Sequence, residues 1–362
     1  MVSMAPEMPP PDIAPAQPTS ADPRYERAQV QLDRLWQRGT QFLGCRYALM
    51  GGAMTWVSER HLVAAISNAG GFGVIACGAM TPGQLAAEIA GTQALTDKSF
   101  GVNLITMHPQ LDDLIRVCTE ARVGHIVLAG GIPPGGAVRA VKHGGAKLIA
   151  FAPALVLAKR LVRSGADALV IEGSEAGGHI GPVSLTVLAQ EILPHIREVP
   201  VFVAGGLGRG EAILAYLEMG ASGAQLGTRF AAAKESISHP KFKRAFIRAQ
   251  ARDAMPSVQL DERFPVIPVR GLVNEGTKRF LEHQAHTRDR FQAGELSKEQ
   301  AQLEIEQFWA GALRRAVIEG DVEYGSVMAG QSVGMVTSEQ TIAEIIEEIV
   351  GQAVAVLAMR SA

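Results

Sequence analysis

Residues 168–181, ALVIEGSEAGGHIG, carry the strongest signal of this chain's architecture. This stretch begins with an apolar run, Ala168–Ile171, that is typical of a buried β-strand, and continues into a loop rich in glycine. Glycine tolerates positive φ angles and lets the backbone approach a ligand closely. His179 is the only side chain of this loop that titrates near neutral pH, so it is the candidate acid or base. A sharp surface turn with an incidental histidine is the alternative interpretation of this loop taken alone.

The same succession of apolar strand and glycine-containing turn repeats on both sides of this stretch. Segments with helical periodicity separate the strands, for example Glu59–Asn68, Pro82–Thr92, Leu111–Ala121 and Glu211–Met219. We predict eight strands, at Tyr47–Met50, Phe72–Ala76, Phe100–Ile105, His125–Ala129, Lys147–Phe151, Ala168–Ile171, Val199–Ala204 and Ala224–Leu226. Such strands with intervening helices indicate an α/β protein with a TIM (β/α)8 barrel. A doubly wound open sheet is the competing architecture, but no G-x-G-x-x-G motif opens the first unit.

The chain on either side of the barrel differs from it in composition. Residues 1–24 are rich in proline, alanine and methionine and predict a disordered tail, without the basic and apolar regions of a signal peptide. Residues 25–44 predict an N-terminal helix, 45–237 the barrel, and 238–320 a smaller, charged, helical inserted domain or lid. Residues 321–362 predict a return segment and a C-terminal helix that closes the barrel. The helices we expect in these parts are Lys241–Gln250, Thr277–Arg290, Lys298–Ile318 and Ile342–Leu357.

Composition restricts the class of protein. The chain has 362 residues, 47% of them hydrophobic, and a formal net charge of −2, which fits a globular enzyme and gives no basic surplus for nucleic acid or an anionic membrane. Cys45, Cys77 and Cys118 are far apart, so we predict no disulfide framework and no zinc site, and we expect a reducing, cytoplasmic location. No apolar run reaches the roughly 18 residues of a transmembrane helix. No metal-ligand spacing is present, so we predict no bound metal.

Two glycine-containing loops predict a phosphate site. Gly205 and Gly206 follow the seventh strand, and Gly227 and Thr228 follow the eighth. These loops lie at the carboxyl ends of adjacent strands, where TIM barrels carry their active sites and often bind phosphate. The glycines expose backbone amides and the threonine adds a hydroxyl donor. Ordinary strand-to-helix turns are the alternative, but two such loops side by side favour a phosphorylated ligand.

Several motifs together resemble the nitronate monooxygenase superfamily, formerly called 2-nitropropane dioxygenases. They are residues 67–73, 172–181, 203–206 and 223–230. Within this superfamily the chain is most similar to the flavin-dependent enoyl-acyl-carrier-protein reductases. That similarity rests on residues 53–57 (AMTWV), 100–103 (FGVN), 157–160 (LAKR), 227–236 (GTRFAAAKES), 320–322 (GDV) and 325–331 (GSVMAGQ). It covers the chain from about residue 46 to the C-terminus and excludes the tail and the first helix.

The resemblance implies an FMN-binding TIM barrel with a smaller inserted domain. Matching positions assign the FMN phosphate to Gly205, Gly206, Gly227 and Thr228. They place the isoalloxazine ring against Gly52, Ala53, Met54 and Asn103, its edge or the ribityl chain near Glu172, Gly177 and Gly178, and Gln331 over the pocket. His179 would be the acid or base. The first of these loops departs from the family pattern, because Gly51 replaces the usual glutamine and Ala53 the second glycine.

Three hypotheses about function follow from the resemblance. In the first, NADH or NADPH reduces FMN and the hydride passes to an enoyl thioester, with acyl carrier protein as a candidate partner and His179 as proton donor. In the second, a nitronate monooxygenase oxidises alkyl nitronates or nitroalkanes with O2, and His179 is the base. The third is an FMN-binding regulatory or carrier protein without turnover, against which the intact histidine loop argues. Trp56 and the motifs after residue 300 favour the reductase. Apolar positions in the C-terminal helix suggest a homodimer.

Overall fold

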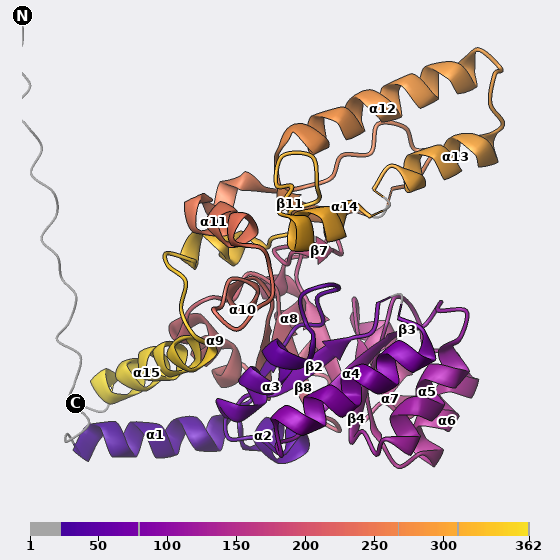
Figure 1. Ribbon diagram of the computed structural model, residues 1–362. Helices are drawn as coiled ribbons and strands as arrows, with labels where there is room; N and C mark the ends of the chain where they lie inside the picture. Colours follow the sequence, from indigo (N-terminus) through magenta and orange to yellow (C-terminus); the bar gives the residue numbers. More distant parts are fainter. Residues whose placement is uncertain (1–22, 79, 267, 310, 361–362) are drawn as a thin grey trace, which may run out of the picture.

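The computed structural model describes residues 23–78, 80–266, 268–309 and 311–360. The predicted tail therefore lies outside the described residues, apart from Pro23 and Arg24, which form the start of the first helix. The described chain consists of a barrel, two helices that precede it, and an insertion that stands over one end of the barrel (Figure 1).

The predicted TIM barrel is confirmed. In the described chain eight parallel strands pair in the order β1-β9-β8-β6-β5-β4-β3-β2, and a bridge between Met50 and Phe72 joins the two ends of the sheet. The open-sheet alternative is thus wrong. The barrel strands are β1 Leu49–Gly51, β2 Gly73–Ala76, β3 Phe100–Ile105, β4 His125–Ala129, β5 Lys147–Phe151, β6 Ala168–Glu172, β8 Val201–Ala204 and β9 Gly223–Leu226.

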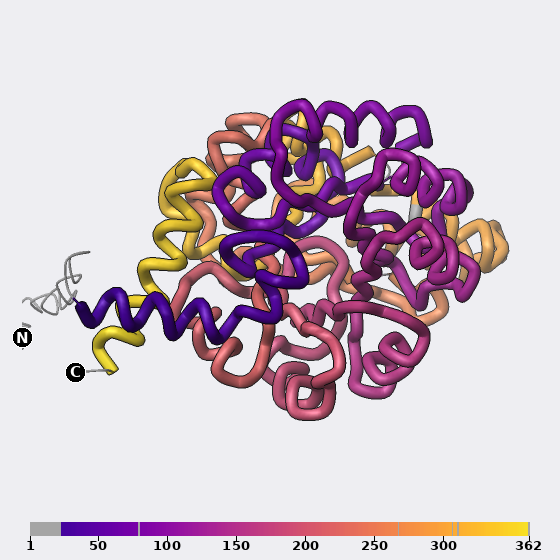
Figure 2. Tube along the Cα trace, turned by 90° about the horizontal axis from the view of Figure 1, so that it is seen from below, coloured from indigo at the N-terminus to yellow at the C-terminus, as the bar shows by residue number. Residues whose placement is uncertain are grey.

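Helices surround the barrel, as the view along its axis shows (Figure 2). They are α3 Arg60–Asn68, α4 Pro82–Leu95, α5 Leu111–Glu120, α6 Gly135–His143, α7 Leu155–Arg163, α8 Leu185–Ile192, α9 Gly210–Glu218, the short α10 Thr228–Ala231 and the final helix α15 Ile342–Arg360. α15 packs against α9 and α3, which places it where the eighth barrel helix belongs. Both figures show α15 beside the first helix, so the two ends of the described chain meet on one side of the barrel.

The single N-terminal helix predicted at residues 25–44 is wrong in detail. The structure has two helices, α1 Pro23–Leu35 and α2 Gln37–Leu43, with a break at Trp36. The break turns α2 onto the base of the barrel, where a side chain at Gly39 would overlap the carbonyl oxygen of Ser222. The carbonyl of Phe42 then accepts a hydrogen bond of 2.8 Å from Nε2 of His125, at the start of β4. Close backbone packing, which the periodicity does not report, decides this geometry.

The insertion after residue 238 is not wholly helical. It contains α11 Pro240–Arg248, a 3₁₀ helix at Ala251–Asp253, strands β10 Ala254–Pro256 and β11 Val269–Leu272, and helices α12 Glu275–Gln292, α13 Lys298–Gln307 and α14 Ala312–Arg314. A π-helical turn at Arg315–Glu319 and a 3₁₀ helix η3 at Gln331–Met335 follow. The predicted helix Lys298–Ile318 is interrupted because Gly311 has a φ of 72°. β11 pairs with β10 on one side and with a two-residue strand β7, Gly178–His179, on the other, so the insertion takes part of its sheet from the histidine loop.

The α12–α13 hairpin has a small core of its own. Phe264, Phe280, Ala301 and Ile305 are buried there, away from the barrel core. Figure 1 shows this hairpin standing out over the barrel end that carries the loops after the strands. Asn274 ties its base to the return segment, because its amide donates to the carbonyls of Val322 at 2.9 Å and Gly325 at 2.8 Å.

A buried arginine links the final helix to the barrel. Arg229 in α10 is 3% exposed and donates to Glu348 of α15 at 2.9 Å and to the carbonyl of Gly208 at 2.8 Å. We predict that Arg229→Met lowers the free energy of unfolding by about 2–3 kcal/mol, because it leaves these acceptors without their cation. The value is below the usual range for a fully buried pair, since Glu348 is 34% exposed. Urea denaturation measures it.

The matched control for that substitution is Arg360→Met. Arg360 also joins α15 to the barrel helices, by an ion pair with Glu218 of α9, but its side chain is 56% exposed. Exposed pairs contribute about 0–1 kcal/mol. Equal losses of stability in the two variants would contradict the structural role given to Arg229.

Candidate active site

The predicted site residues all lie at one end of the barrel. Each is near the carboxyl end of a strand or in the segment that returns from the insertion, which is where a TIM barrel carries its chemistry. Gly52, Ala53 and Met54 follow β1, Asn103 lies in β3, Glu172 ends β6, Gly177 to His179 lie in the next loop, Gly205 and Gly206 follow β8, Gly227 and Thr228 follow β9, and Gln331 begins η3.

The histidine loop is held by the sheet of the insertion. His179 pairs with Val269 and Gly178 with Arg270 of β11, and the amide of Ile180 donates to the carbonyl of Pro268 at 3.0 Å. The loop that the sequence presents as a glycine-rich turn is therefore fixed as a strand. Fixed backbone on both sides restricts where the imidazole of His179 can point, which general acid–base chemistry requires.

Arg270 of β11 also holds the histidine loop in place, and the sequence did not indicate this role. Its guanidinium is 7% exposed and donates to the carbonyl of Ser174 at 2.9 Å and to that of Ala254 at 2.5 Å. Burial lowers its pKa, and the nearby Glu175 carboxylate acts in the opposite direction. An isolated arginine in a four-residue strand has no sequence signal that separates it from a surface residue.

The imidazole of His179 is exposed at the mouth of the barrel. The protein around it still removes enough water to lower its pKa below the usual value of a histidine. His179 is thus mostly neutral at pH 7, a form that can accept a proton directly and can donate one only after it has been protonated.

The return segment locks the histidine loop from the other side. The amide of Gln331 donates to the carbonyl of Glu175 at 2.9 Å, and that of Gly330 to Oγ1 of Thr228 at 3.0 Å. A side chain at Gly177 would come within 2.5 Å of the Gly330 nitrogen. Close backbone packing therefore requires a glycine at position 177, and its contact with the ribityl chain stays a prediction. Residues from β6, β9 and the return segment form one connected unit.

The loops after β8 and β9 have the backbone geometry of an anion cradle. Gly205 and Gly206 have φ values of 96° and 69°, which favour glycine. In the described part of the chain, the amide nitrogens of Gly205, Gly206 and Thr228 donate to no other protein group. The hydroxyl of Thr228 accepts from Gly330 and keeps its own proton for a second bond. Unpaired amides in adjacent loops suit a phosphate.

The loop after β1 lies against the loop after β9. The Met54 sulfur is 3.6 Å from the position that a side chain at Gly227 would take, and Gly52 is close to the Gln225 amide. Ser58 stabilises this loop, since its hydroxyl donates to the Gly52 carbonyl at 2.8 Å and accepts from the Met54 amide at 3.0 Å.

Two polar side chains face the barrel end from otherwise apolar strands. Asn103 of β3 and Gln225 of β9 are each 8% exposed, and neither side chain forms a hydrogen bond with another described residue. Their amide atoms are not among the buried unpartnered atoms of the described chain, so they keep access to solvent and are available to a polar ligand. Gln225 was not among the predicted residues, although a glutamine within a buried strand is a usable sequence signal.

Glu172 has the most perturbed carboxyl group of the site. It ends β6, no other described group donates a hydrogen bond to its carboxylate, and burial raises its pKa to about 7. The residue is nonetheless partly open to solvent, so it faces a recess. Near neutral pH the group is present in both its acid and its carboxylate form, and it can donate as well as accept a hydrogen bond.

A family model described as nitronate monooxygenase matches residues 37–352. The chain belongs to the nitronate monooxygenase family. The resemblance stated from the motifs is thereby confirmed, and the homologues identify this family member as an oxidoreductase. Nitronate monooxygenases and the FabK enoyl-ACP reductases are flavin-dependent, and FMN is their typical cofactor.

Similar proteins come from two groups within this family. A solved structure of FabK from Thermotoga maritima has 36% sequence identity and a TM-score of 0.78, covering 87% of this chain and 95% of that chain. A nitroalkane oxidase from Streptomyces ansochromogenes has 25% identity and a TM-score of 0.73, covering 89% of this chain and 99% of the other.

The name of one relative states that it acts on a coenzyme A thioester. It is the (3aS,4S,5R,7aS)-5-hydroxy-7a-methyl-1-oxo-octahydro-1H-indene-4-carboxyl-CoA dehydrogenase of Rhodococcus jostii, 30% identical over 87% of this chain and 95% of the relative. A probable nitronate monooxygenase of Staphylococcus saprophyticus is 26% identical over 88% of this chain and 98% of its own.

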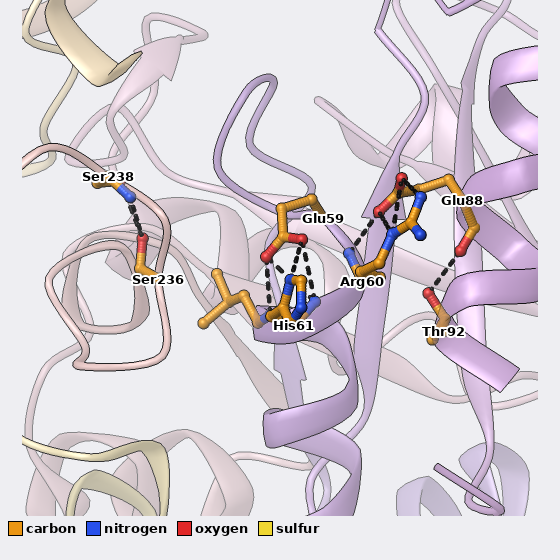
Figure 3. A network of polar contacts seen from close by, with 8 residues as sticks. Glu59, Arg60, His61, Glu88, Thr92, Ser236 and Ser238 are labelled. Carbon is orange, nitrogen blue, oxygen red and sulfur yellow. Dashed lines mark hydrogen bonds and ion pairs between the residues drawn. The ribbon is translucent and has the colours of Figure 1, made fainter. Parts of the chain in front are cut away.

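The rim beside the β1 loop uses its acids and bases for structure. Figure 3 shows Glu59 facing His61 and Arg60 reaching Glu88. The Glu59 carboxylate accepts from the amides of His61 and Leu62 at the start of α3 and lies 2.8 Å from Nδ1 of His61. Arg60 joins α3 to α4 through Glu88 at 2.7 Å. His61 is thus engaged in a helix cap and is not a competitor of His179.

Within the described ranges no cluster of three or more histidine, cysteine or acidic side chains is arranged to hold a metal ion. Among the described helices, none is both long and apolar enough to cross a membrane. The thiols of Cys45, Cys77 and Cys118 have pKa values raised to about 11–12 by burial, so they stay protonated and are poor nucleophiles.

The raised pKa of Glu172 predicts how stability depends on pH. The folded protein holds this proton up to about pH 7, whereas the unfolded chain releases it near the ordinary value of 4.5. The unfolded state therefore binds fewer protons between these values, and the stability contributed by the protonated group is lost as pH rises through that window. We expect Glu172→Gln to lessen the fall in melting temperature of the cofactor-free protein from pH 5 to pH 8.

Histidines with lowered pKa, His125 and His179, act in the opposite direction, because they favour the folded state as pH rises. They are present in both proteins, so the difference between wild type and Glu172→Gln isolates the carboxyl group. Parallel curves of melting temperature against pH would show that Glu172 titrates normally.

Proposed function

We propose that this protein is an FMN-dependent oxidoreductase that uses NADH or NADPH to reduce the double bond of an enoyl thioester. The observation that carries the proposal is the connected unit formed by His179, the free amides after β8 and β9, and the return segment at Gly330. It brings a titratable imidazole and an anion cradle to one end of a barrel whose family is flavin-dependent.

The residues present fit FMN. The amides of Gly205, Gly206 and Thr228 would hold the phosphate, and the unpartnered amides of Asn103 and Gln225 suit the polar edge of an isoalloxazine ring. Gly52, Ala53 and Met54 would line the ring, and Gln331 would close the pocket. Glu172, Gly177 and Gly178 would lie near the ring edge or the ribityl chain. Bound FMN supplies hydride transfer through its N5 atom.

The protein's own groups have separate tasks. His179 would transfer a proton to the α-carbon of the substrate while the β-carbon receives hydride, and Glu172 could exchange protons with solvent near pH 7. The insertion would exclude water from the mouth. Trp56, which has a φ of 68° and is 47% exposed, contacts the insertion through the Arg314 guanidinium, 5.8 Å from its ring centre. The cleft for the acyl chain would lie between them.

Two relatives support a thioester as substrate. FabK belongs to the enoyl-ACP reductases, and the Rhodococcus jostii relative is named as a dehydrogenase of a carboxyl-CoA compound. Both names indicate redox chemistry on an acyl thioester. The acyl group would reach this protein on acyl carrier protein or coenzyme A.

A nitronate monooxygenase is the second candidate, and one observation favours it. The pKa of His179 is lowered, which keeps the imidazole in the form that removes a proton from a nitroalkane. The nitroalkane oxidase of Streptomyces ansochromogenes supports the same reaction.

One experiment separates the two candidates. The purified holoprotein is mixed without oxygen with NADH or NADPH, and the visible absorbance of the flavin is followed. Bleaching, followed by recovery on addition of crotonyl-CoA or a crotonyl carrier protein, is the expected result for the reductase. Absence of bleaching by either nucleotide, together with oxygen uptake in the presence of an alkyl nitronate, would support the monooxygenase and refute the reductase.

A further inference from the structure

The insertion carries a row of unpaired cations on α11. Lys241, Arg244 and Arg248 are exposed, and none of the three forms an ion pair with another described residue. Their spacing of three and four residues places them on one face of the helix. The opposite face is buried through Phe242 and Phe246, which pack in the barrel core. Arg252 follows in the next turn of the chain and is also exposed and unpaired.

Most other cations of the described insertion are paired with carboxylates, namely Arg263 with Asp261, Lys278 with Glu275, Arg288 with Asp289, Arg290 with Glu304 and Arg314 with Glu319. Lys243, on the buried side of α11, pairs with Glu339. Arg279 and Lys298 are exposed without an ion pair to another described residue, and they lie on separate helices, α12 and α13. Two acids beside α11 have partners of their own: Glu339 binds Lys243, and the Asp253 carboxylate accepts from the Gln250 amide. Because the whole chain has a net charge of −2, the row on α11 is a local concentration of positive charge.

The row borders the candidate active site. α11 packs against η3, whose first residue, Gln331, is bonded to the histidine loop. Figure 1 shows α11 beside α10, on the same side of the barrel as the phosphate loops and at the level where the insertion begins. A partner bound on α11 could therefore present a tethered group to the mouth of the barrel.

We propose that Lys241, Arg244 and Arg248 are the docking surface for the acidic helix of an acyl carrier protein. A rise of 1.5 Å per residue spreads the three cations over about 10 Å. Such a row matches carboxylates repeated along a helix, whereas the pyrophosphate of coenzyme A is a single compact anion. Exposed charges of this kind act through encounter and orientation, so they affect association more than the chemical step. The proposal rests on the thioester function proposed above.

The test is the double charge reversal R244E/R248E in the holoenzyme. We expect KM for a crotonyl carrier protein to rise about tenfold at low salt, with kcat unchanged and with the difference reduced at high salt. KM for crotonyl-CoA should change less than about twofold. The control is K159E/R163E on α7, a helix with exposed, unpaired cations on the far side of the barrel from α11. Melting temperatures check that both variants fold.

Two results would overturn the proposal. One is an unchanged KM for the carrier protein in R244E/R248E, or an equal change in the α7 control. The other is an equal rise in KM for crotonyl-CoA, which would assign the row to a nucleotide phosphate. If wild type reduces neither thioester, the proposed function fails, and fluorescence anisotropy with a labelled holo carrier protein tests the surface by itself. Binding about tenfold weaker to R244E/R248E than to wild type is then expected, and equal binding overturns it.

Discussion

His179→Ala is expected to lose turnover by about 10²–10⁴-fold while its flavin content stays unchanged. The imidazole is the exposed titratable group at the mouth of the barrel, and β7 and β11 hold its backbone without using its ring. Removing the ring therefore leaves the glycine loops that are assigned to the phosphate as they are. The measurement is the steady-state rate with the substrate found in the anaerobic assay, together with the ratio of flavin to protein absorbance.

The dependence of the wild-type rate on pH distinguishes a catalytic role of His179 from a merely structural one. If His179 donates a proton, the rate falls as pH rises through its pKa, which lies below the usual value. If it removes a proton from a nitroalkane, the rate rises over the same range. His195→Ala is the matched control, because His195 is another exposed histidine and its ring bonds only the Glu191 carbonyl. A wild-type rate in His179→Ala would remove the acid–base assignment.

The sequence predicted the barrel because each of its strands is a long apolar run between glycines. β3, β4 and β5 have the predicted bounds, and the others differ by one or two residues at an end. β7, β10 and β11 were missed because these short strands, GH, AMP and VRGL, are not apolar runs and do not alternate with helical segments. The pairing of β7 with β11 joins residues about 90 positions apart, such as His179 and Val269, and no local pattern reports it. Arg270 was missed for the same reason, as its role depends on that pairing.

The candidate site was predicted more completely than its internal contacts. The phosphate loops after β8 and β9 were predictable from their glycines. Residues that tolerate positive φ angles at the ends of adjacent barrel strands are typical of a phosphate site. The sequence does not show in which direction a side chain at each of these positions would point. A side chain at Gly206 would point to Glu175, 2.9 Å from its Cβ atom, and not to the place of a phosphate. That geometry changes the physical reason for the effect of a substitution there.

Gly206→Val is expected to abolish stoichiometric binding of FMN. At this position the backbone φ is 69°, a left-handed value that valine rarely adopts. Its Cβ atom would also displace Glu175. Glu175 bonds the amide of Leu185 at the start of α8 and accepts from the Gln331 amide. The substitution therefore moves the histidine loop and the return segment together, and the amides of the cradle lose their arrangement. Flavin absorbance of the purified variant, before and after incubation with excess FMN, measures the loss.

Gly145→Val separates this effect from general backbone strain. Gly145 has a φ of 80°, close to that of Gly206, but a side chain there meets no atom within 4 Å. It precedes β5 and lies at the opposite end of the barrel from the candidate site. Both valine variants carry a strain of about 1–3 kcal/mol and should melt at lower temperature than the wild type. Only Gly206→Val should lose FMN, because only there does the strain act on Glu175. Full flavin occupancy in Gly206→Val would place the phosphate elsewhere, and equal loss in Gly145→Val would reduce the effect to stability alone.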